Sequence, residues 1–137
     1  MIRMDPPVNS FPHRRDNMER RRLAESDYRF MCVVWDHEPI SSTRLADRCF
    51  EELGWKKSTS FTMLRKMIQK NYVKKENSAV TSLVSREQVR AEESALFVQQ
   101  TFAGSLPDFL VSFLGGKTIS GEEADTLRML IEEHREG

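Results

Sequence analysis

The sequence predicts a mostly α-helical protein, and three observations lead to that prediction. Charged residues make up 31% of the 137 residues, as is typical of a soluble chain rich in helix. Apolar residues recur at helical spacing in most of the chain after residue 22. Ser85 and Ser120 are each followed three positions later by Gln or Glu, which is the capping box of a helix N-terminus. We expect three helices, a small hairpin and three more helices.

The first two helices are expected over residues 23–36 and 42–53. Pro39 ends the first, because it disfavours helix at the residue before it. Ser41 or Ser42 then caps the second through its hydroxyl. The apolar face of the first helix contains Leu23, Asp27 or Tyr28, Met31, Val34 and Trp35. That of the second contains Leu45, Ala46, Cys49, Phe50 and Leu53.

A tight turn at Gly54 and Trp55 leads into a third helix, residues 57–70. From Gly54 to Lys75 there are seven Lys or Arg and no Asp or Glu, and phosphate binding needs such a local excess of positive charge. Helix, tight turn and basic second helix are the layout of a helix-turn-helix, whose second helix lies in the DNA major groove. The short strands expected at residues 72–75 and 79–81 would form a small wing.

The third helix is expected to have a core face and a DNA face. Its core face contains Ser60, Met63, Leu64, Met67 and Ile68, and its opposite face Ser58, Phe61, Thr62 and Arg65. Arg65 suits a bidentate contact with guanine, and hydroxyls can serve either base. Lysines position the protein on phosphates without specifying sequence. The candidate DNA-binding residues are Lys56, Lys57, Ser58, Thr59, Phe61, Thr62, Arg65, Lys66, Lys70, Lys74 and Lys75.

Two aromatic residues of this region have alternative interpretations. Phe61 either meets a thymine methyl group or is buried by a slight roll of the helix. Trp55 either stacks on a sugar or, as we expect, packs between the helices and fixes their angle. For the polar face as a whole, the alternative to DNA contact is an ordinary solvated helix surface.

The last third of the chain is expected to be a helical unit with helices at residues 85–102, 106–114 and 120–134. Three helices in so short a segment cannot bury much surface alone. The apolar cluster is large for such a unit, and a two-fold homodimer is the commonest way to cover it. The candidate dimerisation residues are Leu96, Phe97, Phe102, Leu106, Phe109, Leu110, Phe113, Leu114, Leu127, Leu130 and Ile131.

Charge is distributed unevenly over three expected domains, although the net charge is zero. Residues 1–22 carry six Arg against three acids, and their three Pro predict a disordered basic N-terminal arm. Such an arm suits a minor groove; it is alternatively a flexible tail, or Met18 is the natural start. Residues 23–84 form the expected DNA-binding domain, and residues 85–137, with five basic and ten acidic residues, the dimerisation domain.

The sequence supports neither an enzyme nor a metal or cofactor site. It has no nucleophile with a plausible base, no phosphate-binding glycine loop and no metal-ligand spacing. His13, His37 and His134 are far apart. Cys32 and Cys49 are expected to be buried thiols in a reducing compartment. No apolar run is long enough to span a bilayer, and no signal-peptide core is present, so we expect a cytoplasmic protein.

Five segments together resemble the BlaI/MecI/CopY-type penicillinase repressor family of winged-helix regulators. They are LAESDYRFMCVVWDHEPIS, residues 45–55, STSFTMLRKMIQKNYV, LVSREQ, and FAGSLPDFLVSFL with ISGEEADTLRMLIEEH, in this order over residues 23–137. The resemblance implies a homodimer whose winged helix binds a palindromic operator. It also implies repression of β-lactam resistance or copper operons. In the resistance branch, a membrane sensor-protease cleaves the C-terminal unit and lifts repression.

The chain departs from the family at several positions. Ala24 replaces the usual Ser or Thr cap, polarity is exchanged between Ser60 and Phe61, and the wing is shorter. No cysteine follows Cys49, so the chain lacks the Cys-x-Cys cluster of the copper branch. The alternative to a repressor is a winged-helix protein-interaction module without specific DNA binding.

Overall fold

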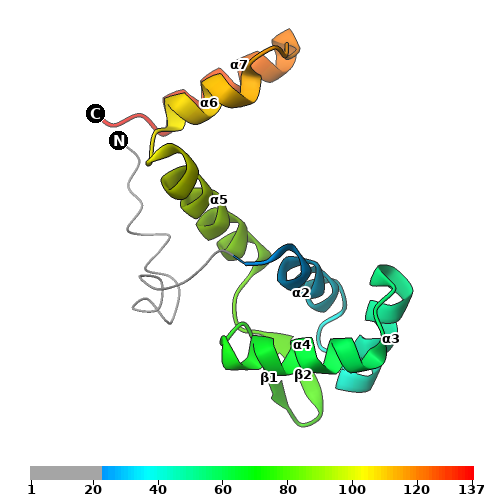
Figure 1. Cartoon of the computed structure of the whole chain (residues 1–137). Helices are drawn as coiled ribbons and strands as arrows, with labels where there is room; N and C mark the ends of the chain where they lie inside the picture. The colour runs from blue at the N-terminus through cyan, green and yellow to red at the C-terminus, as the bar shows by residue number, and fades with distance from the viewer. Residues whose placement is uncertain (1–22) are drawn as a thin grey trace.

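The computed structural model describes residues 23–137 and is mostly α-helical, as the sequence predicts (Figure 1). The expected basic arm, residues 1–22, lies outside the described residues. The elements are α2 (Glu25–His37), α3 (Ser42–Leu53), α4 (Lys57–Gln69), β1 (Val73–Glu76), β2 (Ala79–Ser82), α5 (Arg86–Phe102), α6 (Leu106–Leu114) and α7 (Gly121–Glu133). Together α2, α3, α4 and the hairpin form a winged helix.

Local sequence signals explain where the helices begin and end. The Ser41 hydroxyl accepts a hydrogen bond from the Arg44 N–H at 3.2 Å, and Gly54 ends α3 in the left-handed region with φ 74°. The expected capping box of α5 is confirmed: the Ser85 hydroxyl and the Gln88 side chain each accept from the other residue's backbone N–H. Ala24 precedes α2 without a side-chain cap.

The core of the winged helix lies between α2, α3 and α4. Its fully buried side chains include Phe30, Met31, Val34, Leu45, Cys49 and Met67. Trp55 stacks on Phe30 with ring centroids 6.3 Å apart and planes 4° apart, which confirms that it packs between the helices. Burial also raises the pKa of the Cys49 thiol, whereas Cys32 is only half-buried.

One core prediction was wrong: Phe50 is 62% exposed. The buried stripe of Leu45, Cys49 and Ala46 spans about 100° of the helix, and at about 100° per residue Phe50 lies about 40° beyond Ala46, outside that stripe. The packing of α3 against α2 and α4 covers that stripe and leaves Phe50 outside.

The wing is short but tied to the core. β1 and β2 pair antiparallel, with Val73 opposite Ser82, and a two-residue turn at Asn77 and Ser78 has positive φ at both positions. Such a turn matches the twist of a hairpin. Ile40 exchanges two backbone hydrogen bonds with Val80 of β2. The hairpin is therefore held at its base by the segment between α2 and α3.

The first turns of α5 belong to the same packing, whereas its far end leads away from the winged helix (Figure 1). Trp35 donates its indole N–H to the Val84 carbonyl at 3.0 Å. Arg86 donates to Asp36 at 2.7 Å, which raises the pKa of the guanidinium, and lies over the Trp35 ring. Val89 is buried with this core.

Beyond these turns, the helices have no core of their own. Within the described residues, α6 and α7 contain no buried side chain. Hydroxyls of Ser105 and Ser120 cap them at their N-termini. Among residues 23–137, no helix combines the length and apolar character needed to cross a membrane.

Candidate nucleic-acid interface

The helix α4 has one face in the core and one face in solvent. Ser60, Leu64 and Met67 are buried, and Met63 and Ile68 half-buried, as the spacing predicts. The opposite face is polar and exposed, and it contains Ser58, Thr59, Thr62 and Arg65. A helix fixed from behind in this way can present its outer side chains to a groove without rearranging.

At Ser60 and Phe61 the polar and apolar residues are exchanged relative to the family pattern, and their burial shows the effect. Ser60 faces the core, and its buried hydroxyl lies beside the Cys49 thiol. Phe61 is half-buried at the edge of the exposed face. It is therefore partly withdrawn from the face on which the sequence placed it, with part of its ring still accessible.

Arg65 is held in place on the exposed face by a hydrogen bond to the Thr62 hydroxyl at 3.3 Å. Both side chains are exposed and one helical turn apart, as i and i+3 positions are. The pair places a guanidinium fork, which suits a guanine edge, beside a hydroxyl, which can serve either base.

Four of the seven basic residues expected at this interface are paired with carboxylates. Lys57 contacts Asp47 at 3.1 Å, and Lys74 contacts Glu76 at 3.2 Å, both between exposed side chains. Such exposed pairs are worth at most about 1 kcal/mol and can exchange their partner for a phosphate. The other two paired residues are Lys66 and Lys70, which bind the same aspartate.

That aspartate, Asp27 of α2, is the residue whose role sequence reasoning missed. Its side chain is 1% exposed and lies within 2.9 Å of the Lys66 ammonium and 3.4 Å of the Lys70 ammonium. In the sequence, this role is indicated only by a carboxylate at a position on the apolar face of the first helix. Because its partners lie 39 and 43 residues away, no local pattern connects them.

Three cations have no carboxylate partner in the part of the chain that the structure describes. They are Lys56, just before α4, Arg65 on it, and Lys75 in the wing. All three are exposed. They lie before, within and after α4 in the sequence. Because they have no carboxylate partner among the described residues, they are the cations most available to phosphates or bases.

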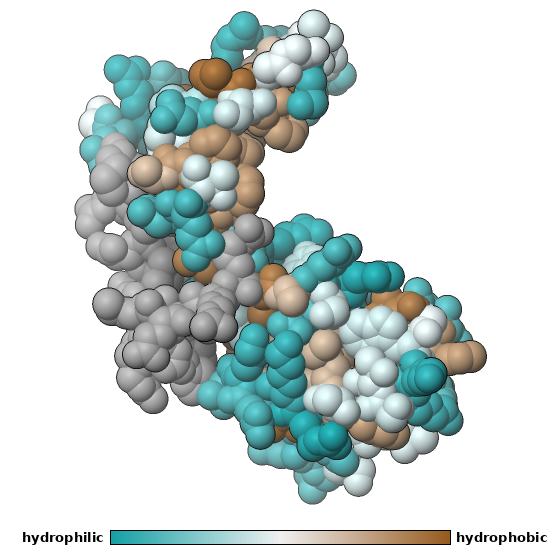
Figure 2. Space-filling model, viewed as in Figure 1, coloured by the Kyte–Doolittle hydropathy of each residue, from teal (hydrophilic) through white to brown (hydrophobic). Residues whose placement is uncertain are grey.

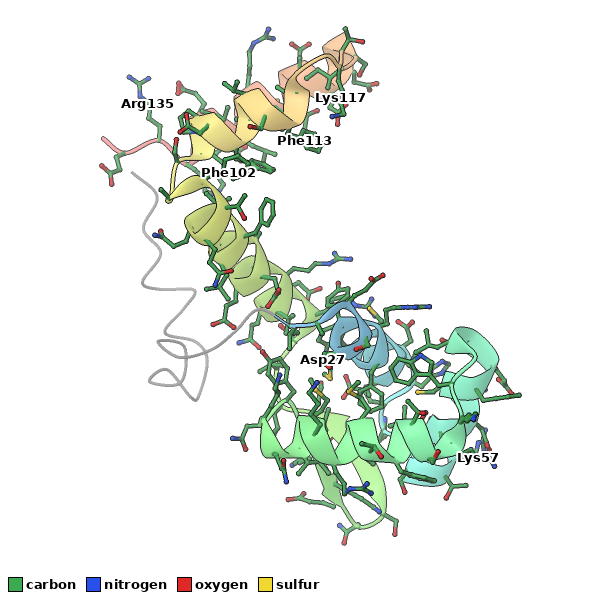
Figure 3. The ribbon with its side chains drawn as sticks, viewed as in Figure 1. Asp27, Lys57, Phe102, Phe113, Lys117 and Arg135 are labelled. Atoms are coloured by element: carbon green, nitrogen blue, oxygen red, sulfur yellow. The ribbon has the colours of Figure 1, made fainter. Side chains whose placement is uncertain are left out.

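A second exposed surface lies at the junction of α5 and α6, where four phenylalanines meet. Phe102 lies 5.8 Å from Phe97 and 5.6 Å from Phe109, measured between ring centroids, and Phe109 lies 5.8 Å from Phe113. Phe113 is 54% exposed and the other three are half-buried. Figure 2 shows brown, apolar residues gathered over α5 and α6, and Figure 3 labels Phe102 and Phe113 in this region. We call these four residues the phenylalanine cluster.

The remaining expected dimerisation residues surround this cluster or lie on α7. Leu106, Leu127, Leu130 and Ile131 are exposed, and Leu96, Leu110 and Leu114 are half-buried. Such a group of exposed apolar side chains marks an interaction surface in a monomer. Among residues 23–137, no three His, Cys, Asp or Glu residues lie close enough together to hold a metal ion.

The fold and the exposed face of α4 define a winged helix-turn-helix protein of the DNA-binding class. Residues 23–133 match the penicillinase repressor family, and the chain belongs to that family. It is a transcriptional repressor by family, and the family is not one of enzymes.

Two relatives and one solved structure are similar to parts of the chain. It is 25% identical over 118 residues to the penicillinase repressor of Bacillus licheniformis, covering 83% of this chain and 92% of the relative. It is 19% identical to the methicillin resistance regulatory protein MecI of Staphylococcus aureus over 80% of this chain and 92% of that one. The activation domain of the phage T4 transcription factor MotA matches with a TM-score of 0.44 at 12% identity, over 64% of this chain and 85% of that domain. That last likeness is too distant to bear on function.

Proposed function

We propose that this repressor binds a palindromic operator as a homodimer, with residues 23–84 on DNA and residues 85–137 joining the two chains. Two copies of α4 would enter successive major grooves on one side of the duplex, about one helical turn or a multiple of it apart. Repression would follow because the bound dimer occupies the promoter.

The exposed polar face of α4 is the observation that supports DNA contact most directly. Arg65, Thr62 and Ser58 project from it while the opposite face is fixed in the core. We assign base contact to these residues and Thr59, and phosphate contact to Lys56, Lys57, Lys74 and Lys75. Phe61 is half-buried at the edge of this exposed face, and we assign it a van der Waals contact with a thymine methyl group.

The homodimer is supported by the open phenylalanine cluster. Helices without a buried residue gain little from hydrophobic burial unless another surface covers them. A second copy of the same chain is always available, and a two-fold axis places each cluster against its equivalent.

The names of the relatives supply the proposed target and signal. One is a penicillinase repressor and the other a methicillin resistance regulator. We therefore propose control of a β-lactam-resistance-type operon, with a membrane sensor-protease as the partner that lifts repression.

Fluorescence anisotropy of the full chain tests DNA binding. The labelled duplex is the sequence upstream of its own gene, the control is a scrambled duplex of the same composition, and both are titrated at two salt concentrations. We expect tight binding that prefers the native sequence. This binding should weaken steeply with salt, because lysines that bind phosphates release counterions from the DNA. Equal or weak binding to both duplexes would contradict the proposal and favour a protein partner instead.

A further inference from the structure

Asp27 connects the first helix of the winged helix to the helix proposed to enter the groove. Its two carboxylate oxygens are divided between two lysines: Oδ1 accepts from Lys66 and Oδ2 from Lys70. Figure 3 labels Asp27 where α2 faces α4. Lys66 lies in the last turn of α4 and Lys70, four residues later, is its C-cap, so the carboxylate holds the end of that helix at two points.

Burial makes these contacts unlike the other lysine pairs of the interface. A buried carboxylate that loses its partners is left without compensation, which costs far more than opening an exposed pair. Asp27 is 1% exposed, whereas the carboxylates that contact Lys57 and Lys74 lie in solvent. A phosphate can therefore take Lys57 or Lys74 at little cost, whereas drawing Lys66 and Lys70 away from Asp27 would leave a buried carboxylate without partners.

Helical spacing shows what the two contacts fix. At about 100° per residue, Lys66 and Lys70 lie on one flank of α4, between the exposed face of Ser58 and Thr62 and the core face of Met67. Holding that flank against α2 sets the roll of α4 about its axis. This rotation decides which side chains of α4 point outward. A small change in it would turn Arg65 away from the exposed face and bring a neighbouring side chain into its place.

We propose that Asp27 is a positioning residue for operator recognition, and that Lys66 and Lys70 serve it rather than the DNA phosphates. This inference rests on the proposed DNA binding by α4 and differs from the sequence-based expectation that these two lysines bind DNA. It predicts that specificity depends on a residue that never touches DNA. It also predicts that two of the seven interface cations contribute nothing to counterion release.

Salt dependence tests the assignment of the lysines. Affinity for the native duplex is measured at several salt concentrations for the full-length wild type, Lys66→Gln, Lys70→Gln and the control Lys56→Gln. Each phosphate contact contributes about 0.9 to the slope of log affinity against log salt. We expect Lys56→Gln to lower the slope by about one and the other two variants to leave it unchanged.

Asp27→Asn tests the positioning role, because it keeps the shape of the side chain and removes its charge. We expect the slope to steepen by roughly one to two, because the released lysines reach phosphates. The preference for the native over the scrambled duplex should fall, while affinity for the scrambled duplex rises. Thermal unfolding checks that the variant is folded; if it is not, the two lysine variants decide the question alone.

The outcomes separate this inference from the proposed function. If Lys66→Gln or Lys70→Gln lowers the slope as much as Lys56→Gln, those lysines bridge Asp27 and a phosphate through their several N–H donors, and the inference is wrong. An unchanged sequence preference in folded Asp27→Asn would also overturn it. Wild-type protein without salt-sensitive, sequence-selective binding would overturn the proposed function as well.

Discussion

The two ends of the described chain differ in where their apolar side chains go. In α2, α3 and α4, large residues such as Phe30 and Met67 are completely buried within one chain. In α6 and α7, by contrast, no described residue is buried, and Phe113 of the phenylalanine cluster is 54% exposed. The first region buries its apolar side chains within one chain, whereas in the second region the proposed homodimer would complete that burial. Stability and assembly should therefore respond to different substitutions.

The largest expected effect is on the stability of the winged helix. Phe30→Ala removes a fully buried ring that stacks on Trp55, and we expect the free energy of unfolding to fall by about 3–5 kcal/mol. Phe50→Ala is the matched control from the same unit, and because Phe50 is exposed we expect a change within about 0.5 kcal/mol. Urea unfolding measures both. Similar losses in the two variants would show that the described core is wrong.

The next largest effect is on assembly. Phe109→Asp places a carboxylate in the middle of the phenylalanine cluster, and we expect monomers in sedimentation velocity. Affinity for a dyad duplex should fall by about 100-fold or more, because a second half-site no longer adds to the first.

Ser112→Asp is the matched control for assembly, because Ser112 lies on the exposed polar side of α6. It adds the same charge to the same helix and should leave the dimer intact. Dimers of Phe109→Asp at low concentration would place the interface elsewhere.

Recognition of the operator sequence is expected to depend on Arg65 of the winged helix. Arg65→Ala should weaken operator binding by about 1–3 kcal/mol and relax the sequence preference, if the guanidinium reads a base. Anisotropy against duplexes substituted at single positions measures both effects. Loss of affinity with an unchanged preference would instead assign Arg65 to a phosphate.

The smallest effect is expected at the boundary between the two regions. Ser85→Ala removes the hydroxyl that accepts from the Gln88 N–H at the start of α5, and we expect a loss of about 1 kcal/mol. Since α5 begins on the winged helix, urea unfolding should register the loss in the same transition as Phe30→Ala. A loss confined to a separate, earlier transition would mean that α5 folds with the C-terminal helices.

Helix boundaries could be predicted from the sequence because they depend on local chemistry. Ser41, Gly54, Ser85 and Ser120 each act through hydrogen bonds or dihedral angles within a few residues, so their effect is visible in the chain itself. The two faces of α4 followed from spacing for the same reason.

Tertiary contacts could not be predicted in this way. Phe50 belongs to an apolar pattern, and only the packing of α3 against two other helices shows that it remains outside. The pairing of Asp27 with Lys66 and Lys70 joins residues about forty positions apart, so the sequence presents three separate charges. The residues of the DNA interface and of the dimer interface remain predictions.

In the proposed assembly, the open C-terminal helices of one chain are covered by those of a second, and the pair holds one operator. Sedimentation equilibrium of the wild type, alone and with a native-sequence duplex, measures this assembly. We expect twice the mass of one chain in the absence of DNA, and two chains on each duplex in the complex. A folded monomer that binds the duplex one chain at a time would contradict it.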